Sequence, residues 1–316
     1  MKLRYFHISI FILLCQLGFG QQDGLFTQFA YNKLSYNPAY ASQINYAEVG
    51  ILFRDQWNGL EGAPMSQQVS GVVPFKKYRM GIGALVSKES IGIQESINLR
   101  TMYSYTVPTD FGNLSGGLEI SLRSHSLDFT DDRLVAFETI GADPNLNNQT
   151  TTSYLFNTGL GFYFKNQTFF ASVSVPRLLS NGYIDNNLSE SREERHLYVM
   201  AGTEITINSS FDFLPQILFK LAPNSPYDFD IQAGILYNKE YHIGINYRTG
   251  GNKNSLGESM SLLLGLQPLE RFFLGLSYDV TFSQLRRYET GSLEAMIRYT
   301  FGNNNPKEIL TNPRYF

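Results

Sequence analysis

The feature that most constrains this chain is an alternation of apolar and polar residues that recurs over most of its length. Each repeat has about 10 to 13 residues and is followed by a turn. A period of two residues is typical of β-strands with two different faces, because successive side chains point to opposite sides. In the stretch 292–301, Leu293 and Ile297 share one face, whereas Glu294 and Arg298 share the other. The pattern predicts an all-β fold.

The number and length of these segments narrow the fold further. There are about 14 of them, and an even number is what a closed bacterial outer-membrane barrel requires. Each has at least the roughly 9 to 11 residues that a tilted strand needs to cross a bilayer. The predicted segments span residues 46–56, 65–75, 78–88, 94–107, 112–127, 152–165, 168–177, 195–208, 210–222, 227–238, 240–249, 257–268, 271–282 and 291–302.

The connections between the segments alternate in length. The short ones lie near 76–77, 108–111, 166–167, 209, 239 and 267–270, and the longer ones cover 58–64, 89–93, 128–151, 178–194, 223–226, 250–256 and 283–290. Outer-membrane barrels have short periplasmic turns and longer outer loops, whereas a soluble β-sandwich predicts no such alternation. The sequence therefore predicts a transmembrane outer-membrane β-barrel of about 14 antiparallel strands over residues 46–302. If the first strand leaves the periplasm, the long loops are extracellular and both termini are periplasmic.

The composition agrees with a barrel and excludes several other classes. Charged residues make up 17 % of the chain, against roughly 25 % in a soluble domain, and aromatic residues make up 14 %. This combination excludes a helical membrane protein, a disordered chain and a collagen-like repeat. The formal charge of -3 gives no electrostatic reason to expect nucleic acid as a partner.

The first twenty residues predict a secretory signal peptide. Lys2 and Arg4 precede an apolar run from Ile8 to Leu17, and Gly18 and Gly20 then place small residues at both cleavage-determining positions. The alternative, a membrane anchor, needs about 20 apolar residues, roughly twice the length of this run. Cleavage after Gly20 removes Cys15, which is the only cysteine. The mature chain is then expected to have no disulfide and no thiolate metal site.

Closing the sheet into a barrel turns the charged strand positions toward the lumen, because hydrocarbon cannot satisfy them. Both signs are represented, so we expect ion pairs that fill the inside of the barrel. A channel for hydrophobic compounds would instead favour an apolar lumen. The predicted lumen charges are Glu119, Arg123, Glu204, Lys220, Asp228, Asp230, Arg248, Asp279, Glu294 and Arg298.

Residue patterns that carry enzymatic chemistry are hard to find. His125, His196 and His242 lie on separate predicted strands or strand ends, without the spacing of a metal site. Ser124 and His125 are sequence neighbours, which a strand sends to opposite faces. We therefore expect no enzyme activity, no catalytic or metal site and no cofactor.

Two segments outside the alternating pattern flank the predicted barrel. Residues 21–45 are rich in aromatic residues and interrupted by Pro38, so they must pack against something. They are expected to form either a plug in the barrel interior or a periplasmic lid. Residues 303–316 are expected to form a short periplasmic tail.

Several short motifs stand along the chain. They read FTQFAYNKLSYNPAYA from Phe26, FRDQWNGLEGAP from Phe53, VPRLLSNGYI at 175–184, NYRTGG at 246–251, LSYDVTFSQL at 276–285, GSLEAMIRYTFG at 291–302 and a terminal NPRYF, and their key positions are Asn37, Pro38, Ala39, Tyr40, Arg54, Gln56, Trp57, Gly59, Gly62 and Pro64. These motifs resemble those of the PorP/SprF family of outer-membrane proteins from Bacteroidetes, and the resemblance covers essentially the whole mature chain. Two departures are Thr249-Gly250, where an acidic residue and alanine are expected, and Leu293, where a histidine is expected.

The resemblance implies a non-enzymatic component of the type IX secretion system and gliding machinery. It implies that the barrel binds the C-terminal signal domain of large secreted surface proteins, such as gliding adhesins, and supports their secretion and anchoring. Other secretion-system subunits and outer-membrane lipid are the further implied partners. Two rival hypotheses are an outer-membrane porin or hydrophobic-compound transporter, and an outer-membrane enzyme with catalytic residues converging at one rim.

Overall fold

The computed structural model describes residues 24, 26–131, 133, 150–182, 193–223, 227–250, 257–269 and 271–301. The expected signal peptide at 1–20 and tail at 303–316 lie outside them. The strands are β1 (Ala47–Asp55), β2 (Met65–Phe75), β3 (Met80–Ile91), β4 (Gln94–Thr109), β5 (Gly112–Asp128), β6 (Thr150–Lys165), β7 (Phe169–Val175), β8 (Leu197–Thr203), β9 (Ile205–Thr206), β10 (Phe211–Leu221), β11 (Asp228–Tyr237), β12 (Tyr241–Gly250), β13 (Ser259–Leu269), β14 (Phe272–Thr281) and β15 (Ser292–Phe301).

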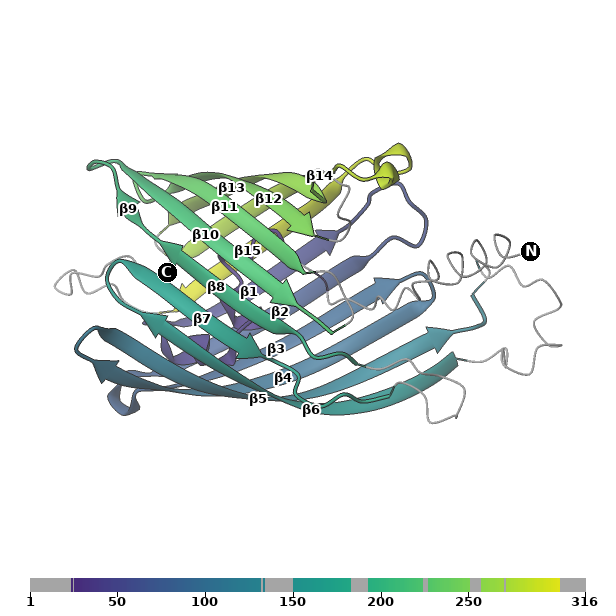
Figure 1. Cartoon of the computed structure of the whole chain (residues 1–316), viewed down its shortest axis with the longest axis horizontal. Coiled ribbons are helices and arrows are strands. Elements are labelled where there is room, and N and C mark those ends of the chain that lie inside the picture. Colours follow the sequence, from purple (N-terminus) through teal and green to yellow (C-terminus); the bar gives the residue numbers. More distant parts are fainter. Residues whose placement is uncertain are drawn as a thin grey trace, which may run out of the picture.

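These strands form one closed antiparallel β-barrel (Figure 1). Strands β8 and β9 both pair with β10 and are separated only by Glu204, so together they make one crossing. The barrel therefore has 14 crossings, and the predicted fold class is confirmed. The first and last strands close the ring with a register from Ala47↔Phe301 to Asp55↔Leu293. Closure pairs the two edges that an open sheet would leave exposed.

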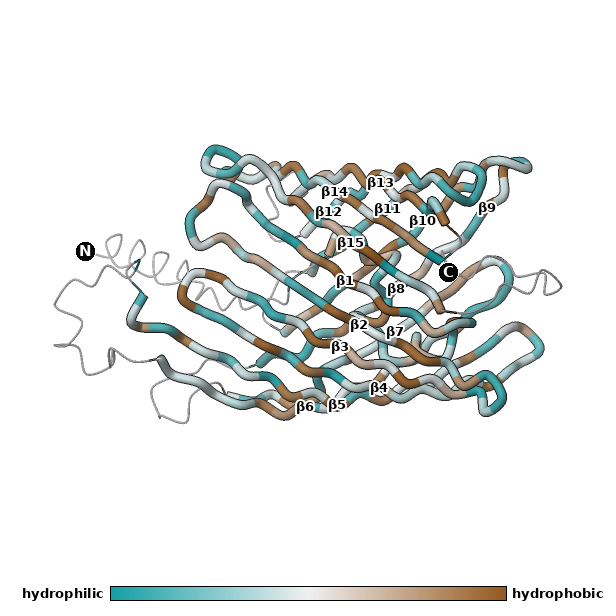
Figure 2. Tube along the Cα trace, turned by 180° about the vertical axis from the view of Figure 1, so that it is seen from behind, coloured by the Kyte–Doolittle hydropathy of each residue, from teal (hydrophilic) through white to brown (hydrophobic). Residues whose placement is uncertain are grey.

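The two faces of the strands differ sharply in polarity. On β15 the outward-facing Leu293, Ile297 and Tyr299 are about two-fifths exposed, whereas Glu294 and Arg298 are buried inside. Apolar and polar colours alternate along the strands in Figure 2. An apolar outer face suits the hydrocarbon of a bilayer, and a polar inner face suits a lumen.

One end of the barrel has short turns and the other, with one exception, has longer connections. The exception is the connection predicted at 89–93, because β3 continues to Ile91 and only Gly92 and Ile93 separate it from β4. We call the two ends of the barrel the short-turn end and the long-loop end. Strand β1 begins and β15 ends at the short-turn end.

The wall is uneven at the long-loop end. Strands β4, β5 and β6 have 16, 17 and 16 residues, whereas β7 and β8 have seven each, so the longer strands project beyond them (Figure 1). Only Leu160–Lys165 of β6 pair with β7. After β7 the chain turns inward, where the N–H of Leu178 donates to the carbonyl of Thr158 at 2.8 Å.

Within the described part of the chain, no helix is long and apolar enough to span a bilayer. The helical elements are single turns of 3-10 type. They are η1 (Lys33–Ser35), η2 (Pro38–Ser42), η3 (Lys76–Tyr78) and η5 (Gln284–Arg287).

Candidate functional site at the long-loop end

Residues 24–46, here called the N-terminal segment, run through the inside of the barrel. Gly24 lines a cavity at the long-loop end together with Trp57 of the β1–β2 connection. Near the other end of the segment, the Gln43 amide donates to Ser115 Oγ at 2.6 Å, close to the short turn between β4 and β5. The chain thus enters the lumen at the long-loop end and reaches β1 at the short-turn end. Gly24, the first residue that the structure describes, thus lies at the long-loop end, away from the short-turn end where the N-terminus was predicted.

A buried cluster of charges fixes the N-terminal segment near its start. Glu294 accepts hydrogen bonds from the backbone N–H groups of Thr27 and Gln28, both at 2.9 Å. Arg54, directly opposite Glu294 in the register, donates to Glu294 at 3.0 Å and to Asp279 at 2.7 Å. The Thr27 hydroxyl also donates to Asp279 at 2.8 Å. These five residues, here called the latch, join the segment to the seam between the first and last strands.

The middle of the N-terminal segment is bound by polar groups from other walls. The Tyr31 hydroxyl lies 2.5 Å from His242 Nδ1 on β12. Arg100 on β4 pairs with Glu119 at 2.6 Å and donates to the Ser35 carbonyl at 2.8 Å. These contacts give the Tyr31 hydroxyl and the Ser35 carbonyl the hydrogen-bond partners that buried polar groups require.

Asn37 and Pro38 of the family motif begin η2. The Asn37 side chain accepts from the N–H of Ala39 at 2.9 Å, which caps this turn, and it donates to the Phe162 carbonyl of β6 at 2.9 Å. Pro38 occupies the first position of the turn, where its missing N–H costs no hydrogen bond. These two residues therefore shape the segment and fasten it to the wall at once.

Ala39 and Tyr40 complete the motif by close packing. The backbone of Ala39 lies so near Gly117 on β5 that a Cβ at residue 117 would overlap it, and Ala41 approaches Gly81 on β3 in the same way. The Tyr40 ring packs against Tyr163, with 5.7 Å between ring centroids. Gly117 and Gly81 therefore leave the space on the inner wall that the backbone of η2 occupies.

Nine of the ten predicted lumen charges are buried on the inner face. Asp230 and Arg248 pair across β11 and β12 at 2.9 Å, and Lys220 lies 4.0 Å from Asp228 across β10 and β11. Arg298 lies 4.0 Å from Glu48. The structure does not gather these charges into one site, since they form separate groups around the wall.

Glu204 is the exception. It lies at the short-turn end between β8 and β9, and its side chain is 15 % exposed. Its partner Lys239 is 45 % exposed and also contacts Asp212 at 2.5 Å. Glu204 therefore belongs to the rim and not to the buried interior, because the β8–β9 break brings it to the edge of the barrel.

Above the latch, the lumen opens into a cavity of about 540 Å³, here called the vestibule. This volume lies within the range of ordinary ligand pockets. Trp57, Pro64 and Ile91 supply apolar surface, and most other lining groups are polar or charged. The lining also includes Gly24, Gln56, Ser66, Glu89, Arg123, His125, Arg177, Glu193, Glu194, His196, Arg248 and Glu258.

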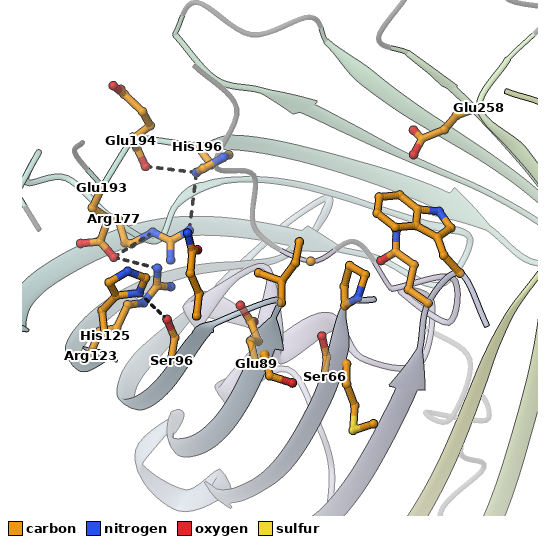
Figure 3. Close-up of a pocket in the computed structure, with 18 of the residues that line it drawn as sticks. Ser66, Glu89, Ser96, Arg123, His125, Arg177, Glu193, Glu194, His196 and Glu258 are labelled. Carbon is orange, nitrogen blue, oxygen red and sulfur yellow. Dashed lines mark hydrogen bonds and ion pairs between the residues drawn. The ribbon is translucent and has the colours of Figure 1, made fainter. Parts of the chain in front are cut away.

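Charged groups are unevenly placed around the vestibule. Arg123 and Arg177 lie on the same side and both contact Glu193, at 3.3 and 3.6 Å. Figure 3 shows these three residues and His196 together, with Glu258 on the opposite side. Burial, together with the positive charge of Lys220 and of the two arginines, lowers the pKa of His196 to about 2, so its imidazole is neutral at ordinary pH.

The β1–β2 connection carries the motif FRDQWNGLEGAP and borders the vestibule. The N–H of Gln56 donates to the carbonyl of Pro64 at 3.0 Å, which closes the loop. Gly59 and Gly62 have φ values of +92° and +72°, where glycine avoids the strain that a Cβ brings. Trp57, which lines the vestibule, also has a positive φ of 56°. The motif therefore specifies the shape of this loop.

Hydrogen bonds join this loop to its neighbours at the rim. The N–H of Asn58 donates to the Gly291 carbonyl of the β14–β15 connection at 2.8 Å, and the N–H of Gly92 donates to the Gly62 carbonyl at 2.8 Å. Arg133 of the β5–β6 connection donates to the Gly92 carbonyl at 2.9 Å. Four connections thus form a continuous rim beside the vestibule.

Several residues of the site were not among the sequence candidates. Arg100 could have been found, because it has the parity of the inward positions on a predicted strand. Arg177 stands in the motif at 175–184 and at the end of the predicted segment 168–177, but β7 ends at Val175 and Arg177 lies in the connection. Glu193 lies in the same connection, where alternation gives no orientation. Thr27 and Gln28 contribute backbone N–H groups, for which residue type carries no signal.

Chemistry at a metal centre finds no support among the described residues. None of their histidine, aspartate and glutamate side chains form a group of three suited to hold a metal ion. His125 instead contacts Ser96 on the adjacent strand at 2.8 Å, and His242 contacts Tyr31. The vestibule offers hydrogen bonds, charge and one indole ring, which suit recognition of a polar macromolecular surface.

A family model for the type IX secretion system membrane protein PorP/SprF matches residues 18–299. The chain belongs to the PorP/SprF family. A comparison with curated protein sequences finds no match. As a PorP/SprF protein with a closed barrel, it is an outer-membrane component of type IX secretion.

Solved structures similar to this PorP/SprF protein are outer-membrane barrels. The Pseudomonas putida toluene transporter TodX has a TM-score of 0.52 at 11 % identity, with 88 % of this chain and 94 % of TodX covered. A TodX mutant described as a monoaromatic hydrocarbon channel gives 0.51 at 13 % identity, covering 84 % and 93 %. Omp33 of Acinetobacter baumannii gives 0.49 at 9 % identity, covering 81 % and 98 %. Identities this low support likeness of fold and not of function.

Proposed function

We propose that this barrel binds the C-terminal signal domain of large secreted surface proteins, such as gliding adhesins, and supports their secretion and anchoring at the cell surface. The long-loop end faces outward in this proposal, as it does in outer-membrane barrels generally. The observation that carries the proposal is the vestibule, which opens among the long connections and lies above a lumen occupied by the N-terminal segment.

The vestibule has the features of a docking site for folded polypeptide. It combines the indole of Trp57 with carboxylates and guanidinium groups, and tryptophan and arginine are enriched where proteins bind each other. The rim hydrogen bonds from Asn58 to Gly291 and from Gly92 to Gly62 hold its edge in one shape. A preformed edge lowers the conformational cost of binding.

A transport role is the alternative, and the interior chemistry is less suited to it. Buried ion pairs such as Arg100–Glu119 and Arg248–Asp230 line the lumen, whereas a path for hydrophobic compounds favours apolar walls. We therefore propose binding at the mouth as the main role, with no catalytic step. Other subunits of the secretion system and outer-membrane lipid are the remaining proposed partners.

The test compares substitutions at opposite ends of the barrel. Trp57→Ala combined with Glu258→Lys changes the vestibule, and Glu240→Lys changes an exposed short-turn residue. We expect the vestibule variant to lose several-fold in co-purified and cell-surface client protein, identified by mass spectrometry after mild detergent extraction. Glu240→Lys should retain both, at equal barrel abundance.

A deletion of residues 133–148 tests the long β5–β6 connection in the same assay. The barrel should fold, because the deletion spares β5 and β6, and client retention should fall. Unchanged client levels in this variant and in the vestibule variant would contradict the proposal. Recovery of a barrel alone, with bound lipid or measurable conductance, would favour transport.

A further inference from the structure

The contacts of the N-terminal segment follow one direction through the barrel. Gly24 lies in the vestibule. Thr27 and Gln28 follow at the latch, where their amides donate to Glu294. Ser42 then reaches the short-turn end, where its hydroxyl donates to Ser115 Oγ at 3.1 Å. The order of residues along the chain is thus the order of positions from the long-loop end to the short-turn end.

This direction is fixed by specific contacts and not by a loose fit. The latch orients the start of the segment through two backbone N–H groups that both point at one carboxylate. The Asn37 amide group orients the later part through the Phe162 carbonyl. The backbones of Ala39 and Ala41 sit where Gly117 and Gly81 leave room. A reversed segment would lose all of these contacts.

We infer that Gly24, the first residue that the structure describes, opens into the vestibule and is reachable from the cell surface, so that the N-terminal segment threads the barrel from its outer end. This inference rests on the proposed outward orientation of the long-loop end. It makes Gly24 part of the surface that an extracellular polypeptide meets. A partner that fills the vestibule would then contact the N-terminal segment as well as the loops.

Threading also sets an order of events in biosynthesis. A leader that still holds the N-terminus at the inner side would keep Gly24 from reaching the outer end. Removal of the leader must therefore precede the final placement of the segment. Because Arg54 and Glu294 face each other across the β1–β15 seam and hold Thr27, the segment is expected to settle as the seam closes.

Single-cysteine labelling tests the inference directly. Once the leader with Cys15 is gone, an introduced cysteine is the only thiol. Gly24→Cys and Ser42→Cys are a matched pair at opposite ends of the same segment. A Cβ at residue 24 meets only Ser66 Oγ at 3.5 Å, an ordinary contact, and serine to cysteine is nearly isosteric. Intact cells are treated with a maleimide on a polyethylene glycol too large for porins.

The expected result is a mass shift of one polymer chain for Gly24→Cys on intact cells and for Ser42→Cys only after the outer membrane is permeabilised. Glu61→Cys, on the long-loop rim, and Ser209→Cys, in a short turn, report the orientation of the barrel. As a second measurement, an epitope inserted just before Gly24 should bind antibody on intact cells. Heat-modifiable migration checks that each variant is folded.

The outcomes separate this inference from the proposed orientation. If Glu61→Cys is labelled on intact cells while Gly24→Cys and the epitope stay protected, the threading direction is overturned and the orientation stands. If Ser209→Cys is labelled and Glu61→Cys is protected, the orientation itself is overturned. Protection of Gly24→Cys even after permeabilisation would show that the start of the segment is closed off, which also overturns the inference.

Discussion

Glu294 connects three parts of the molecule that lie far apart in the sequence. It belongs to the last strand, faces Arg54 of the first strand and accepts two amides of the N-terminal segment. Its side chain has no exposed surface. A buried charge with this many partners is costly to disturb, because removing it leaves the remaining charges and donors unpaired.

Glu294→Gln should therefore destabilise the barrel strongly. The amide keeps the size of the side chain but loses its charge, and its NH2 group faces donors that need an acceptor. We expect a loss of about 3 kcal/mol in the free energy of unfolding, seen as a lower midpoint of heat-modifiable migration in detergent.

Glu204→Gln is the matched control. Its partner Lys239 is 45 % exposed and keeps Asp212 as a second partner, so the loss should stay below about 1 kcal/mol. Equal midpoints for the two variants would contradict this assignment of buried and rim charges.

At the scale of elements, η2 packs directly against the wall because the strand residues beneath it are glycines. Gly117 and Gly81 let the backbones of Ala39 and Ala41 touch the sheet. The adjacent Gly116 faces outward, and a Cβ there would meet only the Phe162 ring at 3.8 Å. Two neighbouring glycines on one strand thus have different consequences when substituted.

Gly117→Ala should displace the N-terminal segment, whereas Gly116→Ala should not. The new Cβ would overlap the backbone of Ala39, which has no flexible end to move aside. We expect trypsin to cut at Lys33, which is 2 % exposed in the native barrel, only in the Gly117→Ala variant. The measurement is limited proteolysis of the detergent-solubilised barrel with mass analysis of the fragments. Resistance of both variants would contradict this packing.

The strands could be predicted from the sequence because alternation and turns are local signals. The predicted segment 46–56 exceeds β1 (Ala47–Asp55) by one residue at each end, and the predicted segment 65–75 coincides with β2. The orientation of Glu294 and Arg248 follows from the same parity. By contrast, the break at Glu204 and the length of β3 depend on pairing with neighbouring strands, which alternation does not encode.

The site itself was far less predictable. The N-terminal segment has no periodicity, and its direction depends on contacts such as Thr27 with Glu294, which are 267 residues apart in sequence. The vestibule wall uses Arg177 and Glu193 from a connection. The family motifs marked Arg54 and Asn37 as notable, but only the structure gives their partners.

At the scale of the whole molecule, the N-terminal segment determines whether the lumen of the barrel is filled or open. A barrel of this many strands has an interior wide enough to hold a ligand or water unless side chains or a plug fill it. Here the latch, the Tyr31–His242 contact and η2 occupy the lumen at successive levels. A filled interior is consistent with binding at the mouth.

Deletion of residues 24–43 should turn the barrel into an ion-conducting pore. The charged inner wall would then face water, and planar-bilayer recordings should show stepwise current that the intact protein lacks. Deletion of residues 133–148, which leaves the segment in place, is the control and should stay silent. If the deletion variant does not fold, Gly81→Ala with Gly117→Ala offers a milder test. Large, steady current through the intact protein would contradict a filled lumen.

Only Gln43 to Tyr46, the last four residues of the N-terminal segment, separate η2 from β1. A segment held by so short a tether stays at a high effective concentration, of the order of millimolar or more, next to its binding site on the inner wall of the barrel. If a partner or a mechanical pull displaced it, the segment could not diffuse away and would compete to return as soon as the disturbance ended. Any opening of this barrel would therefore reverse itself without a second protein to reseal it.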